Sequence, residues 1–222
     1  MILRRSDGYI GTLIDDLVTK GTNEPYRMMT SRSEYRLLHR QDNADKRLCG
    51  IGLRIGLISQ ERYDAVQEKY AEVEREIKRL EKTHVAPSEE LNAYLEEHGT
   101  APVLSGASLA ELIRRPQLSY EGLKPFDSDR PELPRPVRYQ AEISLKYDGY
   151  IRRQLKQVED FAGMENRLLP DDINYDEVTG LRLEAREKLK KIRPRSFGQA
   201  SRISGVSPAD ISVLMVWMEG RR

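Results

Sequence analysis

Apolar residues recur along most of this chain at intervals of three or four, the spacing that places them on one face of an α-helix. The clearest run follows Ser59, where steps of four and three alternate and leave one narrow apolar seam between charged residues. The seam consists of Val66, Tyr70, Val73, Ile77 and Leu80. We expect this helix to form one arm of a hairpin or packed pair within the chain, with self-association through the seam as the alternative.

Further helices are predicted on both sides of this run. Near the N-terminus, Ser6 or Asp7 can cap a helix that ends near Gly21. Its apolar face consists of Ile10, Leu13, Ile14 and Leu17. A long helix is expected over residues 143–158, although alternation just before it leaves room for a short strand.

The predicted fold is mainly all-α, with a coiled-coil-like helix pair and a small terminal helical bundle. We expect connector helices over residues 1–56 and a helical arm with short helices over 57–124. Residues 125–136 contain several prolines among charged residues and are predicted to be an extended linker. The remaining residues, 137–222, are expected to form the C-terminal helical bundle.

Composition and residue spacing limit the kinds of site that we expect in this chain. The single cysteine, Cys49, cannot form an internal disulfide bond, which favours a reducing, cytoplasmic setting. His39, His84 and His98 lack metal-ligand spacing, so we expect no metal site, and no nucleophile stands beside a histidine base. No apolar run is long enough to cross a bilayer. The net charge is only +1, but it conceals strongly basic stretches.

The densest group of candidate binding residues lies in residues 21–45. Ser31 and Glu34 have the spacing of a capping box, which predicts a short helix that begins at Arg32. Residues four apart share one face of a helix, so three arginines would form a row. They are Arg32, Arg36 and Arg40.

A row of guanidinium groups suits a nucleic-acid backbone, because each group can bind two phosphate oxygens at once. The candidates in this stretch are Arg27, Arg32, Arg36 and Arg40 for phosphate, and Tyr26 and Tyr35 for stacking on unpaired bases. The alternative is an internal ion-pair lattice in which nearby carboxylates neutralise the arginines. These carboxylates are Glu24, Glu34, Asp42 and Asp45.

A second basic region lies near the C-terminal end. A basic helix is predicted over residues 183–192, and two short helices joined at Gly205 follow it, an arrangement that can present N–H groups and basic side chains to phosphate. The basic candidates are Lys188, Lys191, Arg193, Arg195 and Arg202. A docking face for a protein partner is the main alternative. Burial in a bundle core is expected for Val213, Leu214, Val216 and Trp217.

Four stretches carry a resemblance to a known family. In chain order they are SDGYIGTLIDDLVTKG (6–21), GTNEPYRMMTSRSEYRLLHRQDNAD (21–45), KYDGYIRRQ (146–154) and IRPRSFGQASRISGVSPADISVL (192–214). They resemble the tRNA uridine 5-carboxymethylaminomethyl modification enzymes, also called glucose-inhibited division protein A or MnmG. The second stretch departs from the commonest family form at Met29, Ser33 and His39, but every arginine stays in place.

The resemblance implies a C-terminal fragment, because the family carries a Gly-x-Gly-x-x-Gly turn in an FAD-binding domain and this chain has none. The family uses FAD, NADH and methylenetetrahydrofolate to modify C5 of the wobble uridine of tRNA, together with the GTPase MnmE. We expect this fragment alone to bind no cofactor and to be inactive. The missing domain is expected to provide most of the homodimer contact and to cover the first helix.

The resemblance also ranks the site residues. Arg27 and Arg36 are the first choices for tRNA contact near the active site, followed by Arg32 and Arg40. The C-terminal helices would dock MnmE through Gln199, Ser201, Ile203, Val206, Asp210, Leu214 and Trp217. The alternative is a purely protein-docking helical module with no direct RNA contact.

Overall fold

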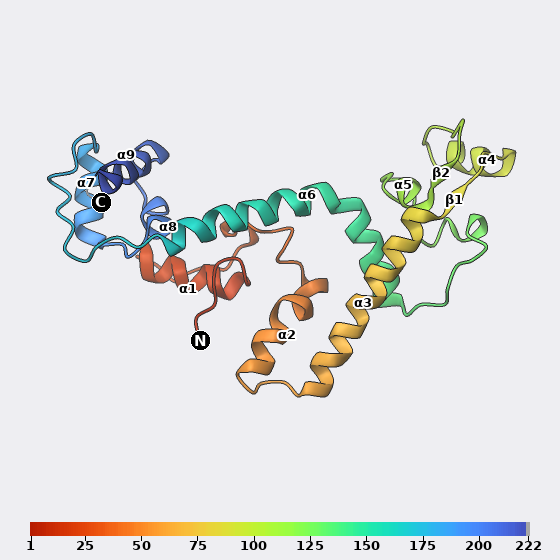
Figure 1. The fold of residues 1–222 in the computed structure, drawn as a ribbon, viewed down its shortest axis with the longest axis horizontal. Coiled ribbons are helices and arrows are strands. Elements are labelled where there is room, and N and C mark those ends of the chain that lie inside the picture. The colour runs from red at the N-terminus through yellow and green to blue at the C-terminus, as the bar shows by residue number, and fades with distance from the viewer. Residues whose placement is uncertain (221–222) are drawn as a thin grey trace. The chain divides into compact units, whose positions relative to one another are not determined.

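The computed structural model describes residues 1–220, which separate into two compact units. One unit comprises residues 40–152, and the other combines residues 1–39 with the described residues from 153 onward. Helices dominate both units, which confirms the mainly all-α prediction (Figure 1). The long helix predicted after the Pro-rich segment is α6, Arg135–Asn166, and residues 137–143, where a short strand was the alternative, belong to this helix.

In the unit of residues 40–152, α2 (Ala44–Arg54) and α3 (Gln60–Lys82) form a helical hairpin that follows the short 3-10 helix η2, Gln41–Asn43 (Figure 1). Gly56 makes the turn with a φ of +75°, a conformation that a side chain would disfavour. The Tyr70 hydroxyl donates to Asp45 Oδ1 at 2.7 Å and ties the two helices together.

The apolar seam of α3 packs inside the chain rather than facing solvent. Tyr70 and Val73 of α3 are buried against Val137 and Ala141 of α6. Because a seam of this length is satisfied by one neighbouring helix, the packed-pair expectation holds within this unit.

Shorter elements surround the end of α3. They are β1 (His84–Val85), α4 (Glu89–Glu97), β2 (Ala107–Ser108), α5 (Leu109–Ile113) and η3 (Lys124–Phe126). The two strands pair antiparallel, with His84 opposite Ser108. Ser108 and Glu111 have the sequence spacing of a capping box, and this box is present at the start of α5. These elements enclose a core whose most buried members are Leu80, Leu91, Leu95, Leu109, Leu112, Ile113, Leu118 and Leu123.

In the other unit, α7 (Leu183–Ile192), α8 (Phe197–Ser201) and α9 (Pro208–Glu219) form the small bundle expected near the C-terminal end. Its core includes Leu169, Tyr175, Val178, Leu189, Phe197, Ala200, Ile203, Ile211 and Leu214. Val213 and Trp217 pack against this core, as predicted. The prediction for Val216 is wrong, because this side chain is 70% exposed on α9.

The first helix, α1 (Tyr9–Thr19), presents its polar face to its own unit. Thr12, Asp16 and Thr19 are buried, whereas Ile14 is 50% and Val18 76% exposed. The predicted side-chain cap is absent: Gly8 precedes the helix, and the Asp7 carboxylate accepts a hydrogen bond from the Arg4 backbone instead. A buried charge network explains why the polar face turns inward.

Candidate nucleic-acid interface

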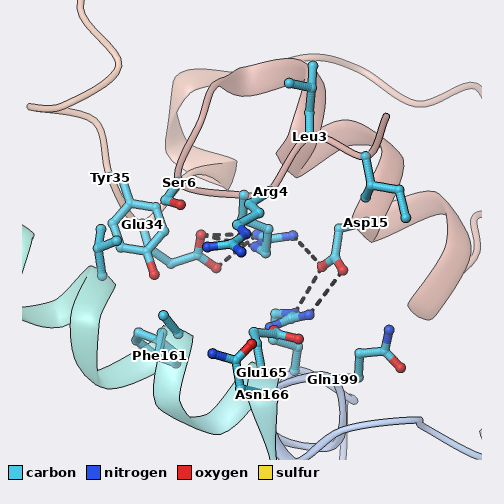
Figure 2. A pocket seen from close by; sticks show the side chains of 15 residues that line it. Leu3, Arg4, Ser6, Asp15, Glu34, Tyr35, Phe161, Glu165, Asn166 and Gln199 are labelled. Carbon is cyan, nitrogen blue, oxygen red and sulfur yellow. Dashed lines mark hydrogen bonds and ion pairs between the residues drawn. The ribbon is translucent and has the colours of Figure 1, made fainter. Parts of the chain in front are cut away.

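Ion pairs join α1 to other segments of its unit (Figure 2). The members are Arg5, Asp15, Asp16, Glu34, Glu165 and Arg202, which we call the Arg5 network. The Arg5 side chain is only 9% exposed, and its Nη1 donates to Asp15 Oδ2 at 2.9 Å and to Asp16 Oδ1 at 2.8 Å. Its Nη2 donates to Glu34 Oε1 at 2.8 Å. A buried guanidinium is therefore matched by three carboxylates.

Arg202 completes the Arg5 network from the far end of the sequence. Its Nη2 donates to Asp15 Oδ1 at 3.0 Å, its Nε lies 2.9 Å from Asp15 Oδ2, and its Nη1 pairs with Glu165. The side chain is 10% exposed. The prediction that Arg202 offers its charge to tRNA is not supported by this geometry, because the guanidinium is enclosed by carboxylates.

Two members of the Arg5 network, Arg5 and Asp16, have pKa values shifted toward their ionised forms. Burial alone would lower the pKa of Arg5, but hydrogen bonds to Glu34 and Asp16 outweigh burial and raise this pKa above its usual value. Burial alone would likewise raise the pKa of Asp16, and hydrogen bonds from Tyr26, Arg5 and Lys20 lower it instead. Arg5 and Asp16 therefore stay ionised at neutral pH.

An open pocket of about 250 Å³ lies beside the Arg5 network (Figure 2). Tyr35 and Phe161 contribute apolar walls, and Asn166 and Gln199 contribute amides. Both buried arginines at its edge already contact carboxylates. The pocket thus has no excess of positive charge to attract phosphate.

The helix predicted from Arg32 does not form. Residues 30–32 make a short 3-10 helix, η1 (Thr30–Arg32), and a hydrogen-bonded turn follows. One local and one long-range bond explain the difference: the Ser33 hydroxyl accepts from the Tyr35 backbone N–H at 3.1 Å, and the Glu34 carboxylate pairs with the distant Arg5 instead of capping Ser31. The arginine row on one helix face is therefore absent.

The turn that carries Arg36 is anchored from three sides. The Leu38 N–H donates to Gln154 Oε1 at 3.2 Å, and Gln154 Nε2 donates to the Glu34 carbonyl at 2.9 Å. His39 Nε2 lies 3.0 Å from the Ser6 carbonyl. Between these anchors the Arg36 side chain is exposed and has no ion-pair partner within residues 1–220. The fold thus presents a free guanidinium on a fixed turn.

The preceding loop presents Arg27 in the same way. The Tyr26 hydroxyl donates to Asp16 Oδ2 at 2.7 Å, and the Arg32 guanidinium lies over the Tyr26 ring at 4.4 Å. These contacts fix the residue beside Arg27, which is itself exposed and makes no ion pair with any described residue. Arg32 is exposed as well, but it is engaged with the Tyr26 ring, a contact that itself stabilises the loop.

Two other members of this stretch are less accessible than predicted. Tyr35 is 5% exposed, with its ring packed edge-on against His39 and Phe161, so no base can stack on it without rearrangement. Arg40 belongs to the unit of residues 40–152, where its Nε donates to Asp42 Oδ1 at 3.1 Å. The internal lattice considered as the alternative therefore exists in part, but it neutralises Arg5 and Arg40 rather than Arg27 and Arg36.

The predicted basic residues of the C-terminal bundle, Arg202 apart, are exposed. Lys188 and Lys191 lie on α7 and make no ion pair within the described chain. Arg193 and Arg195 lie in the turn that joins α7 to α8, and Arg193 Nη1 donates to the Asp171 carbonyl at 3.0 Å. These four cations remain available to a ligand.

Several residues predicted to dock a protein partner instead hold the bundle together. Ile203 and Leu214 lie in its core, and the buried Asp210 carboxylate accepts from Arg182 Nη2 at 2.7 Å. Ser201 donates to the Gly198 carbonyl, and Gln199 accepts from the Arg195 N–H. Val206 and Trp217 are half-buried against the core. A docking surface that includes Ile203, Asp210 or Leu214 is therefore not supported.

The carboxylates and Arg5 of the Arg5 network were not among the residues predicted for the site. One signal was present in the sequence: Thr12, Asp16 and Thr19 recur at helical spacing on α1, opposite the apolar stripe. A regular polar stripe on a short helix is compatible with solvent or with buried partners. Only the positions of Arg5 and Tyr26 distinguish these cases.

Two further findings on residues 1–220 concern metal sites and membrane-spanning helices. Within them, no group of three or more His, Cys, Asp or Glu residues is arranged to hold a metal ion. His39 is instead a buried structural residue, 3.0 Å from the Ser33 hydroxyl, and Cys49 is a buried free thiol on α2. No helix in this described part is both long and apolar enough to cross a membrane.

Comparisons with known proteins agree with the resemblance seen in the motifs. A family model described as the tRNA modifying enzyme MnmG/GidA C-terminal helical domain matches residues 60–155. A second, described as the C-terminal helical bundle of the same enzyme, matches residues 157–222. Together the two models follow one another along most of the chain.

Curated relatives and solved structures give the same result. The tRNA uridine 5-carboxymethylaminomethyl modification enzyme MnmG of Caldicellulosiruptor saccharolyticus is 59% identical over 99% of this chain, which covers 35% of that relative. The enzyme of the same name from Clostridium kluyveri is 57% identical over 98% of the chain, again 35% of the relative. A crystal structure of Aquifex aeolicus GidA superposes with a TM-score of 0.78 at 40% identity, over 98% of this chain and 34% of that one.

The chain thus spans about a third of the length of the relatives that it matches. Its helical architecture, its two family-model matches and its identity to these relatives all point to one assignment. The chain belongs to the MnmG/GidA family of tRNA modifying enzymes, as a C-terminal helical fragment.

Proposed function

We propose that this chain holds tRNA for an FAD-dependent enzyme that installs the carboxymethylaminomethyl group at C5 of the wobble uridine. The names of its relatives and family models support the substrate and the modification. One observation carries the assignment to residues: Arg27 and Arg36 are exposed and make no ion pair within residues 1–220, although Arg5 and Arg202 of the same unit are enclosed by carboxylates.

This contrast matters because paired and free arginines differ in what they offer a phosphate. A guanidinium already forked onto carboxylates must break those bonds before it can bind a new anion. Arg27 and Arg36 avoid this cost, and the contacts of Tyr26 and Gln154 hold their backbones in place. Because these turns are already ordered, binding does not have to fix their backbones and costs only the ordering of the side chains. Both residues are therefore suited to the phosphate backbone of tRNA.

The test is a titration of tRNA with the purified chain at several salt concentrations. In the parent, the logarithm of the binding constant should fall linearly with the logarithm of salt concentration, by about 0.9 per phosphate contact. The double variant Arg27→Ala/Arg36→Ala should bind more weakly, with a slope shallower by roughly two.

A charge-matched control separates a specific contact from a general loss of positive charge. Arg54 and Arg62 are exposed in the other unit, so Arg54→Ala/Arg62→Ala removes the same charge elsewhere. This control should keep the parent's slope. Equal slopes for the parent and the Arg27/Arg36 variant would refute the assigned contacts, and absence of any tRNA binding by the parent would favour a protein-docking module.

We propose that the whole enzyme uses FAD, NADH and methylenetetrahydrofolate. The residues of this chain, however, do not fit a flavin. A dinucleotide pyrophosphate is typically held where a parallel sheet meets a helix N-terminus. In residues 1–220 the named strands are β1 and β2, two residues each and antiparallel. We therefore assign no flavin contact and no chemical step to this chain.

We also propose that the bundle docks the GTPase MnmE, through the exposed side of α9 rather than through the buried residues predicted first. Val216 is an apolar side chain that is 70% exposed on this helix. Val216→Glu should weaken a complex with the GTPase without unfolding the bundle, whereas Leu214→Glu should unfold it. Unchanged affinity of the folded Val216→Glu variant in a pull-down titration would remove α9 from the docking surface.

A further inference from the structure

A second pocket in the unit of α1 differs from the others in its charge. It has a volume of about 320 Å³ and lies between Val18 and Thr19, at the end of α1, and the turn of residues 192–195. Two arginines, Arg193 and Arg195, line it, and no carboxylate does. Three other pockets of the described chain each include Asp or Glu side chains in their walls.

The two arginines are held by their backbones. Arg193 ends α7 with its N–H donating to the Leu189 carbonyl at 2.9 Å, and its φ of 51° makes it the one non-glycine residue with positive φ in the described chain. The Arg195 N–H donates to Gln199 Oε1 at 2.8 Å, and its carbonyl accepts from the Leu169 N–H. The intervening Pro194 is buried. The turn is therefore fixed before any ligand arrives.

The donors in this pocket have spare capacity. Neither Arg193 nor Arg195 has a carboxylate within ion-pairing distance in the described chain, and the Arg193 side chain donates only to the neutral Asp171 carbonyl among these residues. Gln199 uses its Oε1, which leaves the Nε2 group as a donor without a partner among residues 1–220. Two guanidinium groups and an amide N–H₂ around one hollow are the donors that a phosphate requires.

We propose that this pocket binds one phosphodiester of the RNA backbone, with its ribose, through Arg193, Arg195 and Gln199. The proposal rests on the proposed tRNA-binding function and gives it a second, separate contact. The pocket volume lies at the small end of ligand pockets, which suits a single nucleotide fragment rather than a folded domain. The exposed Lys188 and Lys191 on α7 extend the positive charge beyond it.

Gln199 thereby changes role, from a predicted protein contact to an RNA contact. Phosphate contacts fix the register of a nucleic acid without reading its sequence. The pocket would accordingly position tRNA on the bundle and leave the choice of tRNA to other residues. Binding through this pocket should be independent of the base carried by the bound nucleotide.

The experiment uses the whole chain and a variant that keeps the backbone. Asn tolerates positive φ better than most residues, so Arg193→Asn/Arg195→Gln removes both charges while preserving the turn. We expect tRNA affinity to fall roughly tenfold and the salt slope to become shallower by roughly two. The Arg54→Gln/Arg62→Gln variant, with the same loss of charge, should keep the parent's slope.

A second measurement tests this site without RNA, and the tRNA titrations separate failure of the site from failure of the tRNA proposal. In an NMR titration with inorganic phosphate, the Arg193 and Arg195 Nε–H signals of the parent should shift, and those of Arg54 and Arg62 should not. If tRNA binds the parent and the Arg193/Arg195 variant equally, with equal slopes, this site is wrong while the tRNA proposal stands. If the parent binds no tRNA, the proposal of an RNA phosphate is overturned along with it, whatever inorganic phosphate does.

Discussion

Arg202 Nη2 donates to Asp15 Oδ1 at 3.0 Å across a sequence separation of 187 residues. The bond joins α1 to the residue that follows the last residue of α8, and both groups are largely buried, at 10% and 19% exposure. Because Asp15 also binds Arg5, one carboxylate connects two arginines from opposite ends of the chain. The Arg5 network therefore has a structural role in which residues 1–39 are held against the C-terminal bundle.

The first prediction concerns the coupling of Arg202 and Asp15. In a double-mutant cycle of Arg202→Ala and Asp15→Ala, followed by urea unfolding, the coupling free energy should be about 1 kcal/mol or more, because the groups contact each other away from solvent. The exposed pair Arg152 and Asp148 provides a control that should show no measurable coupling. Additive effects at Arg202 and Asp15 would contradict the structural role.

The second prediction follows from the inward polar face of α1. Asp16→Ala removes a shared partner of Arg5, Tyr26 and Lys20 and should lower the free energy of unfolding by about 2 kcal/mol, since the Arg5 guanidinium and the Tyr26 hydroxyl each lose a largely buried acceptor. Ile14→Ala, at a half-exposed site on the same helix, should cost less than about 1 kcal/mol. The reverse order in urea titrations would mean that the apolar face of α1 is the buried one.

Both predictions depend on which face of α1 is buried, and hydrophobic periodicity alone does not reveal this. The spacing of Ile10, Ile14 and Leu17 correctly predicts a helix, because helix formation depends on local pattern. It does not reveal which face is buried, since that depends on Arg5 and Arg202, which approach from elsewhere in the sequence. The expectation that the apolar face of a helix is the buried one fails for α1, because buried carboxylates with hydrogen-bond partners are stable inside a fold.

The same reasoning explains why some candidate arginines are accessible and others are enclosed by carboxylates. Arg36 and Arg202 are indistinguishable by residue type, yet one is free and the other is enclosed by Asp15 and Glu165. Nothing near Arg202 in sequence identifies these partners. Local competition was also decisive at Ser33, whose hydroxyl bonds the Tyr35 N–H and replaces the predicted helix by a turn. A cap formed entirely by sequence neighbours, such as that of Ser108 and Glu111, depends on local spacing alone and follows from the sequence.

The third prediction concerns pH and Asp210. Hydrogen bonds from Arg182 and Ser207 outweigh burial and hold the pKa of Asp210 well below its usual range. A carboxyl whose pKa is lower in the folded state than in the unfolded chain stabilises the fold above the unfolded pKa, about 3.9, and loses that contribution as the pH falls toward the folded value. The stabilising effect of Asp210 should thus be complete at neutral pH and decline below about pH 4.

The measurement compares the parent with Asp210→Asn, which keeps a side-chain oxygen able to accept from the Ser207 N–H in the capping box of α9. At pH 7 the variant should be less stable by about 1 kcal/mol, and the difference should shrink as the pH is lowered below about 4. Because Asp16 also has a lowered pKa, the difference between the two proteins, rather than either curve alone, reports on Asp210. A difference that does not change with pH would exclude the proposed ion pair as its source.

The last prediction compares two buried tyrosines, of which only one has a hydrogen-bond partner for its hydroxyl among residues 1–220. The Tyr175 side chain is 1% exposed, burial raises its pKa to about 12, and its hydroxyl has no hydrogen-bond partner within residues 1–220. An unpaired buried hydroxyl is destabilising, so Tyr175→Phe should leave the free energy of unfolding unchanged or raise it by about 1 kcal/mol. Tyr120 is the matched control, because its buried hydroxyl donates to Glu76 Oε1 at 2.7 Å.

Tyr120→Phe should lower the free energy of unfolding by about 2 kcal/mol, since it takes a donor from a buried carboxylate. Urea unfolding of the parent and both variants, with tRNA affinity measured alongside, gives the comparison. A loss of stability in Tyr175→Phe as large as that in Tyr120→Phe would show that the Tyr175 hydroxyl has a partner. The tRNA affinity of Tyr175→Phe should equal that of the parent, because the buried hydroxyl cannot be reached by a ligand, and an unchanged affinity would show that the variant keeps the native fold.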